Sequence, residues 1–317
     1  MVELGYQITS ALPYTNGEPG HNEAVGYDRL EFKVIDKNKL LSLAAKSKML
    51  GKNEVIGEKD KTVVINYTST GIQVISYEPF IINHPRRLFN KMACRVLDLT
   101  NTILSPTADN LDETFARSQL LEEIILPDEW KTDSIVTMNK TFAACYKLKE
   151  IKNLQILKSN KVVQMGGTFT FCSSLESFDV TQLDFSNVQT LESFMNCCRK
   201  LRHIEISKMD LSSVKNVSEA FGSIAIEYAD LSNMDLRSLY DFSNMFFECD
   251  HLKRISLAGA KLDSFVSLEK IANNSTEFRT LILSDTEVNH KLVKKQRLNT
   301  NYTGYGMMKN PVDIIWV

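Results

Sequence analysis

From about residue 110 to residue 285, apolar residues recur along the chain with a period of about 26 residues. Each period contains an anchor phenylalanine that ends a short amphipathic stretch, and successive anchors are 27, 27, 25, 27 and 25 residues apart. A period near 26 lies inside the range of leucine-rich repeats and below the periods of helical-pair arrays and propellers. The anchors are Phe115, Phe142, Phe169, Phe194, Phe221 and Phe246, and a seventh unit follows at Ile271.

Every unit continues in the same way after its phenylalanine. Three residues later comes a small apolar residue, often a cysteine, and then a short L-x-x-I-x-L segment with the alternation of a strand. A return arm follows, in which LDFSNV (183–188) and MDLSSV (209–214) supply turn-forming Asp and Ser. The cysteines in this position are Cys145, Cys172, Cys197 and Cys249, and Cys198 is interpreted as an insertion outside the pattern.

A single unit of this kind cannot bury its apolar face alone, whereas stacked units share a continuous core and need a cap at each end. The sequence therefore predicts an α/β repeat fold, a leucine-rich-repeat solenoid of about seven coils. The predicted division is a small α+β N-terminal domain over 1–85, the solenoid over 86–285 and a C-terminal cap over 286–317. Inside such a core, equivalent phenylalanines and cysteines of successive coils lie over one another.

The flanking segments are not repetitive. Residues 61–77 form two β-rich runs around Ser69-Thr70-Gly71, which predicts a hairpin, and residues 30–50 begin strand-like and become helical. Residues 92–100 (MACRVLDLT) have the pattern of a degenerate first coil. Residues 312–317 are expected to form a strand that closes the far end.

The repeat phrase M-F-x-x-C-x-x-L, followed by L-D-x-S-x-V, resembles the leucine-rich repeats of the BspA-like family of bacterial surface proteins. The match is clearest in SNMFFECDHLKRISLAGAKLDS (243–264), and the resemblance extends over about residues 110–285. It implies a repeat fold that serves as a binding surface, often that of an extracellular adhesin. The sequence departs from that pattern because secretion and wall-anchor signals are not visible in it.

The charge balance limits the partners that such a protein can have. Lys and Arg number 37 against 39 Asp and Glu, and the resulting formal net charge of −2 disfavours a general nucleic-acid binder. No apolar run approaches the length needed to cross a bilayer. We therefore expect a cytoplasmic protein without a direct nucleic-acid or membrane partner.

The stretch ITSALPYTNGEPGH (8–21) resembles the signature turn of methionyl-tRNA synthetases. It retains His21 but lacks the first His-x-Gly pair, and a faint echo of the Lys-Ser loop, at 46–57, begins only about 25 residues further on. No nucleotide-binding domain fits between these segments, so the chain is not a synthetase. Three interpretations of the turn stay open: a coincidental Asn-Gly hairpin turn, a captured gene fragment, and a mimic that competes for a partner of the synthetase.

Candidate chemistry elsewhere in the sequence is weak. The regular spacing of the cysteines favours buried apolar filler over a metal or redox site. The five histidines show no H-x-x-x-H or H-E-x-x-H spacing, and neither a Walker loop nor a G-x-S-x-G elbow occurs. We therefore predict a non-enzymatic protein that uses no cofactor and no metal.

Residues on either side of the central apolar residue of each strand point away from the core, so stacking arranges them in two columns on a concave face. The middle of this face is acidic, which predicts a protein partner with a basic surface, such as a nucleic-acid-binding protein. An ordinary solvated strand face is the alternative. The predicted partner-binding residues are Glu123, Glu150, Lys152, Asp179, His203, Glu205, Tyr228, Asp230 and Arg254.

Three functions are compatible with these features. The first is a cytoplasmic protein-binding solenoid, for example an inhibitor or host-interaction factor of a mobile element or phage. The second is a cell-surface or secreted adhesin module. The third is a nucleotide-binding enzyme activity in residues 1–85, which ATP binding that is lost on His21→Ala would support.

Overall fold

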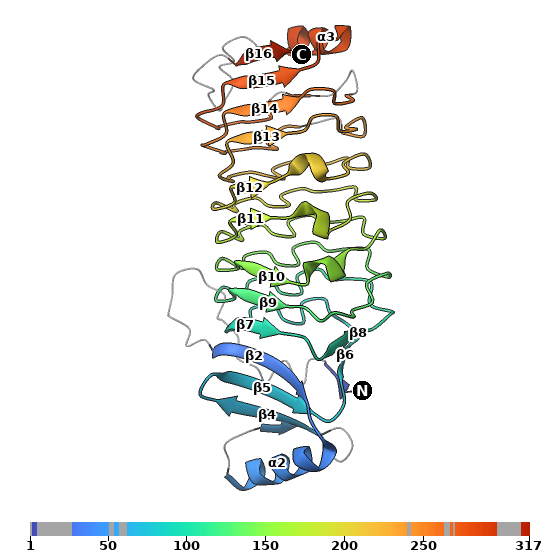
Figure 1. The fold of residues 1–317 in the computed structure, drawn as a ribbon, viewed down its shortest axis with the longest axis vertical. Coiled ribbons are helices and arrows are strands. Elements are labelled where there is room, and N and C mark those ends of the chain that lie inside the picture. The colour runs from blue at the N-terminus through green and yellow to red at the C-terminus, as the bar shows by residue number, and fades with distance from the viewer. Residues whose placement is uncertain are drawn as a thin grey trace.

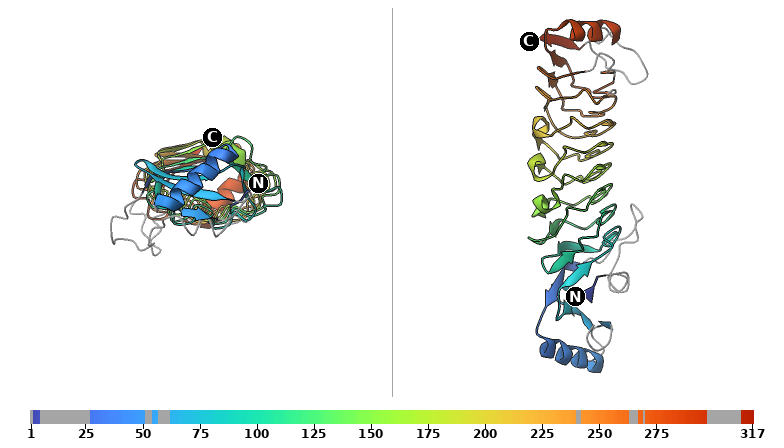
Figure 2. Two further views of the ribbon diagram at one scale, coloured as in Figure 1. Left: turned by 90° about the horizontal axis from the view of Figure 1, so that it is seen from below. Right: turned by 90° about the vertical axis from the view of Figure 1, so that its right-hand side faces the viewer.

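The computed structural model describes residues 2–4, 27–50, 54–56, 62–239, 242–262, 267–268, 270–296 and 312–317. Its architecture is mixed α/β and is dominated by short parallel strands in several sheets (Figure 1). The strands follow one another along a narrow, nearly straight column, with α2 (Lys37–Leu50) at one end and α3 (Glu287–Gln296) at the other (Figures 1 and 2). Successive units of the sequence therefore lie one above the next in a repeat-like arrangement.

The N-terminal end of the column is a mixed sheet of seven strands in the order β10-β9-β7-β2-β5-β4-β3. The predicted hairpin within 61–77 is confirmed by antiparallel β4 and β5, and the predicted strand and helix within 30–50 are β2 and α2. At Gly71, which has a φ of 150°, a Cβ atom would lie 2.0 Å from the Arg29 carbonyl oxygen, so the close pairing of β2 with β5 requires glycine. The bounds are β2 Tyr27–Val34, β3 Glu54–Ile56, β4 Val63–Thr68, β5 Gly71–Ser76, β7 Cys94–Asp98, β9 Glu123–Ile125 and β10 Glu150–Lys152.

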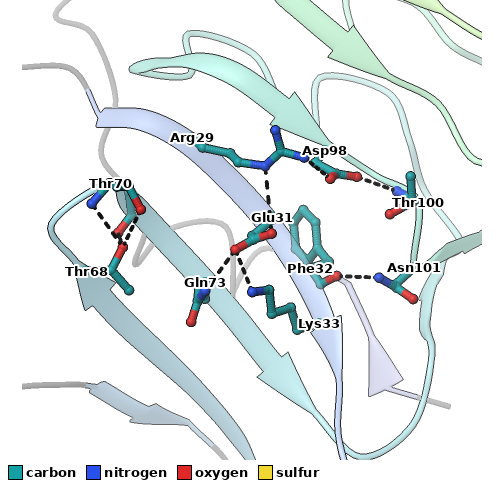
Figure 3. A network of polar contacts seen from close by, with 11 residues as sticks. Arg29, Glu31, Phe32, Lys33, Thr68, Thr70, Gln73, Asp98, Thr100 and Asn101 are labelled. Carbon is teal, nitrogen blue, oxygen red and sulfur yellow. Dashed lines mark hydrogen bonds and ion pairs between the residues drawn. The ribbon is translucent and has the colours of Figure 1, made fainter.

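The N-terminal strands and the first repeat units share one sheet, because β2 pairs in parallel with β5 on one side and with β7 on the other. Polar contacts reinforce this junction: the Arg29 guanidinium pairs with Asp98, and Asn101 donates to the Phe32 carbonyl at 2.9 Å (Figure 3). The N-terminal segment thus covers the end of the column by direct strand pairing. A small neighbouring sheet contains β1 Val2–Glu3, β6 Phe80–Ile82 and β8 Thr102–Leu104.

The remaining strands form a two-stranded parallel sheet, β11-β12, and a four-stranded parallel sheet, β13-β14-β15-β16. The strand predicted within 312–317 is confirmed by β16, which pairs with β15 at the far end. Short 3-10 turns follow three of the strands: η2 Leu154–Leu157, η3 Val180–Gln182 and η4 Ile206–Lys208. The strand bounds are β11 Ser177–Phe178, β12 His203–Ile204, β13 Tyr228–Asp230, β14 Arg254–Leu257, β15 Thr280–Leu283 and β16 Asp313–Trp316.

Each unit turns through two residues with left-handed backbone, four positions apart, as at Lys140 (φ 54°) and Ala144 (φ 58°). The N–H of the second residue donates to the next unit, and the Ala144 N–H reaches the Thr170 carbonyl at 2.8 Å. These bonds hold equivalent residues of successive units in line. The first pair directly precedes β7, so the segment 92–100 belongs to the first unit, as predicted. The pairs are Arg87/Lys91, Glu113/Arg117, Lys140/Ala144, Gly167/Phe171, Ser193/Cys197, Glu219/Ser223, Asn244/Glu248 and Lys270/Asn274.

The predicted column of phenylalanines is wrong at one position, Phe194. The rings of Phe142 and Phe169 are stacked, with centroids 5.1 Å apart and planes at 10°, whereas the Phe194 ring lies at 88° to that of Phe169. It is the Met195 N–H that donates to the next unit, to the Ala220 carbonyl at 2.8 Å, in the way the phenylalanine N–H groups do elsewhere. Met195 therefore occupies the repeat position, and Phe194 fills the core from the position before it.

Candidate partner-binding site on the strand face

The strand face is defined here as the residues on either side of the central apolar residue of strands β9 to β15. Parallel pairing sets it in register within β9–β10, within β11–β12 and within β13–β15. The pair Tyr228↔Arg254 together with Asp230↔Ser256 gives the short 221–231 unit the predicted register. The first column contains Glu123, Glu150, Ser177, His203, Tyr228, Arg254 and Thr280, and the second contains Ile125, Lys152, Asp179, Glu205, Asp230, Ser256 and Ile282.

Two of the predicted acidic residues have lysine partners within the chain. The Lys152 ammonium pairs with Glu123 in the neighbouring unit, and the Lys208 ammonium pairs with Glu205 within the same unit. Hydrogen bonding to these carboxylates raises the pKa of both lysines. The strand face is therefore less acidic than a count of its Asp and Glu residues suggests.

Two further acidic residues are anchored locally. Asp179 accepts hydrogen bonds from the Thr181 N–H at 2.9 Å and the Thr181 hydroxyl at 2.7 Å, and these bonds lower the pKa of Asp179. Asp230 accepts from the Ser232 N–H at 3.0 Å. The bonds fix both carboxylates at the ends of their strands, and Asp179 stays exposed while Asp230 is half-buried.

The aromatic part of the strand face lies on β13. Tyr228 is 40% exposed, and the Arg254 guanidinium lies over its ring, 5.2 Å from the ring centre. His203 lies on β12, the strand before β13, where it lines an open hollow of about 590 Å³ with Asp179 and Glu205. Tyr and Arg are the side chains that most often dominate protein–protein binding. The structure thus places the predicted His203, Tyr228 and Arg254 in one column beside two of the predicted acids.

A second charged column, which the sequence analysis missed, lies two residues before the central apolar residue of each strand. Its sign alternates from Arg95 to Lys253. Glu122 contacts Arg95 at 3.2 Å and Lys149 at 2.7 Å, and further along, Lys253 contacts Glu227 at 3.0 Å. The sequence does contain a signal for this column, because one residue in each repeat unit alternates between a basic and an acidic side chain. These exposed pairs contribute little to stability individually, but they disfavour a slipped register, in which like charges would meet.

The buried cysteine column is confirmed at Cys145, Cys172 and Cys249 and wrong in one unit, where Cys198 takes the place predicted for Cys197. Cys198 is fully buried and its thiol donates to the Phe169 carbonyl at 3.1 Å, while Cys197, predicted to belong to the column, is only half-buried. Loss of solvation on burial raises the pKa of Cys145, Cys198 and Cys249 to about 12. Such thiols stay protonated at neutral pH and are poor nucleophiles.

We expect Cys197 to be the first of the six cysteines to react with a thiol reagent in the folded protein, because the other five are buried. Titration with a chromogenic disulfide at about pH 8 should release about one equivalent from the native protein and all six in denaturant. The Cys197→Ser variant should release close to none, and Cys198→Ser should behave like the wild type. Rapid labelling of Cys198 would contradict the observed register.

Other candidate chemistry finds no assembled site in the part of the chain that the structure describes. There, His, Cys, Asp and Glu residues form no group of three or more that could hold a metal ion. No helix among the described residues is both long and apolar enough to span a membrane. The synthetase-like turn at 8–21 lies outside the described residues, so its three interpretations stay predictions.

Comparison with known proteins finds a family match for the repeat region. A model of the family described as Mycoplasma protein of unknown function, DUF285, matches residues 109–225 and 163–286. Together the two overlapping matches span 109–286, a little over half of the 317 residues. No curated protein and no solved structure matches the chain. The chain therefore belongs to the DUF285 family of Mycoplasma proteins of unknown function.

Proposed function

We propose that this chain is a leucine-rich-repeat solenoid of the BspA-like type, which binds a protein partner through its strand face and has no enzymatic activity. The solenoid assignment is supported by one short parallel strand per unit of about 26 residues and by the backbone bonds that align the units. The binding role rests above all on one observation: the Tyr228–Arg254 pair lies exposed, in register, beside a row of acidic side chains.

The proposed partner has a basic surface. Asp179 and Glu205 directly follow β11 and β12, Asp230 ends β13, and Lys208 is the lysine that pairs within this group. Carboxylates in successive units repel one another and gain from an approaching cation. A basic partner, such as a nucleic-acid-binding protein, would be steered by this charge and held by Tyr228 and Arg254.

In this proposal the protein acts in the cytoplasm, where a binder without chemistry would serve as an inhibitor or host-interaction factor of a mobile element or phage. A surface adhesin module is the second candidate, because its repeat phrase resembles that of BspA-like surface proteins. Protease treatment of intact cells distinguishes the two. Digestion of the protein on intact cells would support the adhesin, and protection until lysis would support the cytoplasmic binder.

Reversing the charges of Asp179, Glu205 and Asp230 to Lys is expected to abolish capture of the partner. Like charges then face the partner, and repulsion of this kind costs several kcal/mol across an interface. The measurement is affinity capture from native lysate with mass spectrometry, comparing wild type and the triple variant. The expected result is one stoichiometric basic protein that is retained by wild type and lost by the variant.

The matched control reverses three exposed charges away from the strand face, in Lys131→Glu/Lys161→Glu/Lys215→Glu. This control should retain the partner, and circular dichroism should show both variants folded. Equal capture by wild type and the Asp179/Glu205/Asp230 variant would overturn the strand face as the binding site. A Tyr228→Ala variant then tests the aromatic part separately, with an expected loss of about tenfold or more in affinity.

A further inference from the structure

We propose that two copies of this chain associate side by side and antiparallel along one flank of the column, the turn edge. The turn edge comprises the second left-handed residue of each unit and the two positions that follow the buried cysteine column. This inference is independent of the strand-face function, because it uses different side chains.

Backbone hydrogen bonds align the turn edge from unit to unit. The Arg117 N–H donates to the Ala143 carbonyl at 2.7 Å, and the Glu248 N–H donates to that of Asn273 at 2.9 Å. Every unit between the unit of Arg117 and the unit of Glu248 makes the same bond to its successor. The residues equivalent to Arg117 therefore form one row, which contains Ala144, Phe171, Cys197, Ser223 and Glu248. The positions of charges along this row are therefore fixed by the backbone.

The turn edge carries two blocks of opposite charge. Exposed side chains of the earlier units are basic or aromatic, whereas those of the later units are mainly acidic apart from His251. A rotation of a second copy by 180° places each basic block against the acidic block of the other copy, which is the self-complementary contact that a two-fold dimer requires. The first block contains Arg117, Tyr146, Lys147, Phe171, Arg199 and Lys200, and the second contains Glu248, Asp250 and Glu277.

The two blocks meet at a notch. The intervening unit presents the small side chains of Ser223 and Ala225, and an open hollow of about 320 Å³ lies there between Arg199 on one side and Glu248 and Asp250 on the other. The notch gives the long side chains of a second copy room to cross between the blocks. It therefore lies where the two-fold axis would pass.

The basic block also exposes an aromatic pair. Phe171 is 43% exposed and Tyr146 is 37% exposed, with ring centres 6.3 Å apart. Phe171 has a φ of 60°, an uncommon conformation for a bulky residue, and the fold holds its ring on the surface nonetheless. Clustered exposed aromatic side chains are typical of interaction sites.

A second copy is favoured over a foreign ligand because it uses both blocks. An acidic peptide or a single-stranded nucleic acid would occupy the basic block and leave the acidic block unused. The small net charge of −2 also leaves little overall repulsion between copies. About a two-fold axis at the notch, Arg199 and Lys200 of one copy face Glu248 and Asp250 of the other, so the antiparallel dimer uses both blocks.

Sedimentation velocity of the full chain tests the proposal at about 20 µM protein, in about 50 mM and about 500 mM NaCl. Wild type should sediment at twice the chain mass of 36.0 kDa in low salt and at 36.0 kDa in high salt. The basic-block variant Lys147→Glu/Arg199→Glu/Lys200→Glu and the acidic-block variant Glu248→Lys/Asp250→Lys/Glu277→Lys should each be monomeric. Lysine is tolerated at position 248, because Lys140 and Lys270 have the same left-handed backbone.

An equimolar mixture of the two variants tests whether the basic block of one copy contacts the acidic block of the other. Apart from Arg117, the edge of the first variant is acidic in both blocks and that of the second is basic in both, so the mixture should restore a dimer that contains one copy of each. The control variant Lys131→Glu/Lys161→Glu/Lys215→Glu should remain dimeric. The proposal is overturned if wild type stays at 36.0 kDa in low salt, if the mixture fails to associate while both variants are folded, or if oligo-dT binds a monomeric wild type through the basic block.

Discussion

Replacing Phe142 by alanine is expected to lower the free energy of unfolding by about 4 kcal/mol, the usual cost of truncating a buried phenylalanine. Its ring is fully buried and stacks between those of Phe115 and Phe169, with centroids 5.2 Å and 5.1 Å away. The backbone bonds between units fix the spacing of the stack, so the neighbouring rings cannot move together to fill the cavity. Urea unfolding followed by circular dichroism measures the loss, and hydrogen exchange should locate it in the units around residue 142.

Phe171→Ala is the matched control, because the same side chain is removed from the surface of the same region. Its ring is 43% exposed, and Ala144 already adopts the equivalent left-handed backbone with a φ of 58°. We expect a change within about 0.5 kcal/mol, as is usual for surface positions, when both variants are compared in about 500 mM NaCl, where the chain is expected to be monomeric. Equal losses for the two variants would show that the Phe142 stack does not stabilise the column in the way the structure indicates.

Much of the architecture was predictable from the sequence because its periodicity reports which residues must be buried. The short parallel strands, the hairpin within 61–77 and the closing strand within 312–317 follow from alternation and spacing. The junction at the N-terminal end was not predictable. Pairing of β2 with β7 joins segments far apart in the chain, and nothing in the local pattern of either segment specifies that partner.

The register within units was predictable except where two apolar residues stand side by side. Phe194–Met195, Cys197–Cys198 and Ile271–Ala272 each offer two candidates for one core position. In each pair the structure places the second residue in the repeat position, because the left-handed residues Ser193, Cys197 and Lys270 set where the turn occurs. The positions of left-handed residues cannot be predicted from the pattern of apolar and polar residues. The three-residue spacing to the buried column is nevertheless kept, counted from Met195 to Cys198.

The candidate sites differ in how far the sequence reveals them. The alternation of side chains along each strand was enough to predict the strand-face columns, and the strand pair that contains Tyr228 and Asp230 has the predicted register. The lysine partners of Glu123 and Glu205 were not foreseen, because side-chain pairing between units depends on rotamers that the sequence does not encode. The opposite charge blocks of the turn edge become visible only when the left-handed residues align the units.

The buried cysteine column provides the second large expected effect, and it separates two explanations of why cysteine is there. The thiol of Cys172 donates to the Phe142 carbonyl at 3.2 Å, a contact repeated by other cysteines of the column. Nearer the ends of the column serine takes the same position, and the hydroxyls of Ser118 and Ser275 donate to the Phe89 and Phe246 carbonyls at 3.1 Å and 2.8 Å. In the units that carry cysteine or serine, the side chain at this position is therefore a hydrogen-bond donor as well as apolar filler.

If the donor matters, Cys172→Ser should cost less than about 1 kcal/mol, whereas Cys172→Ala should cost about 2 kcal/mol through the lost donor and the cavity left by sulfur. The loss of the thiol donor accounts for only about half of that cost. The Phe142 carbonyl is not left without a partner, because it still accepts a hydrogen bond from the Cys145 N–H at 3.3 Å. Apolar filler alone predicts the reverse order, because a buried hydroxyl without a partner is costly. Urea unfolding of the two variants distinguishes the two explanations. If the serine variant is less stable than the alanine variant, apolar filling alone explains the buried cysteines.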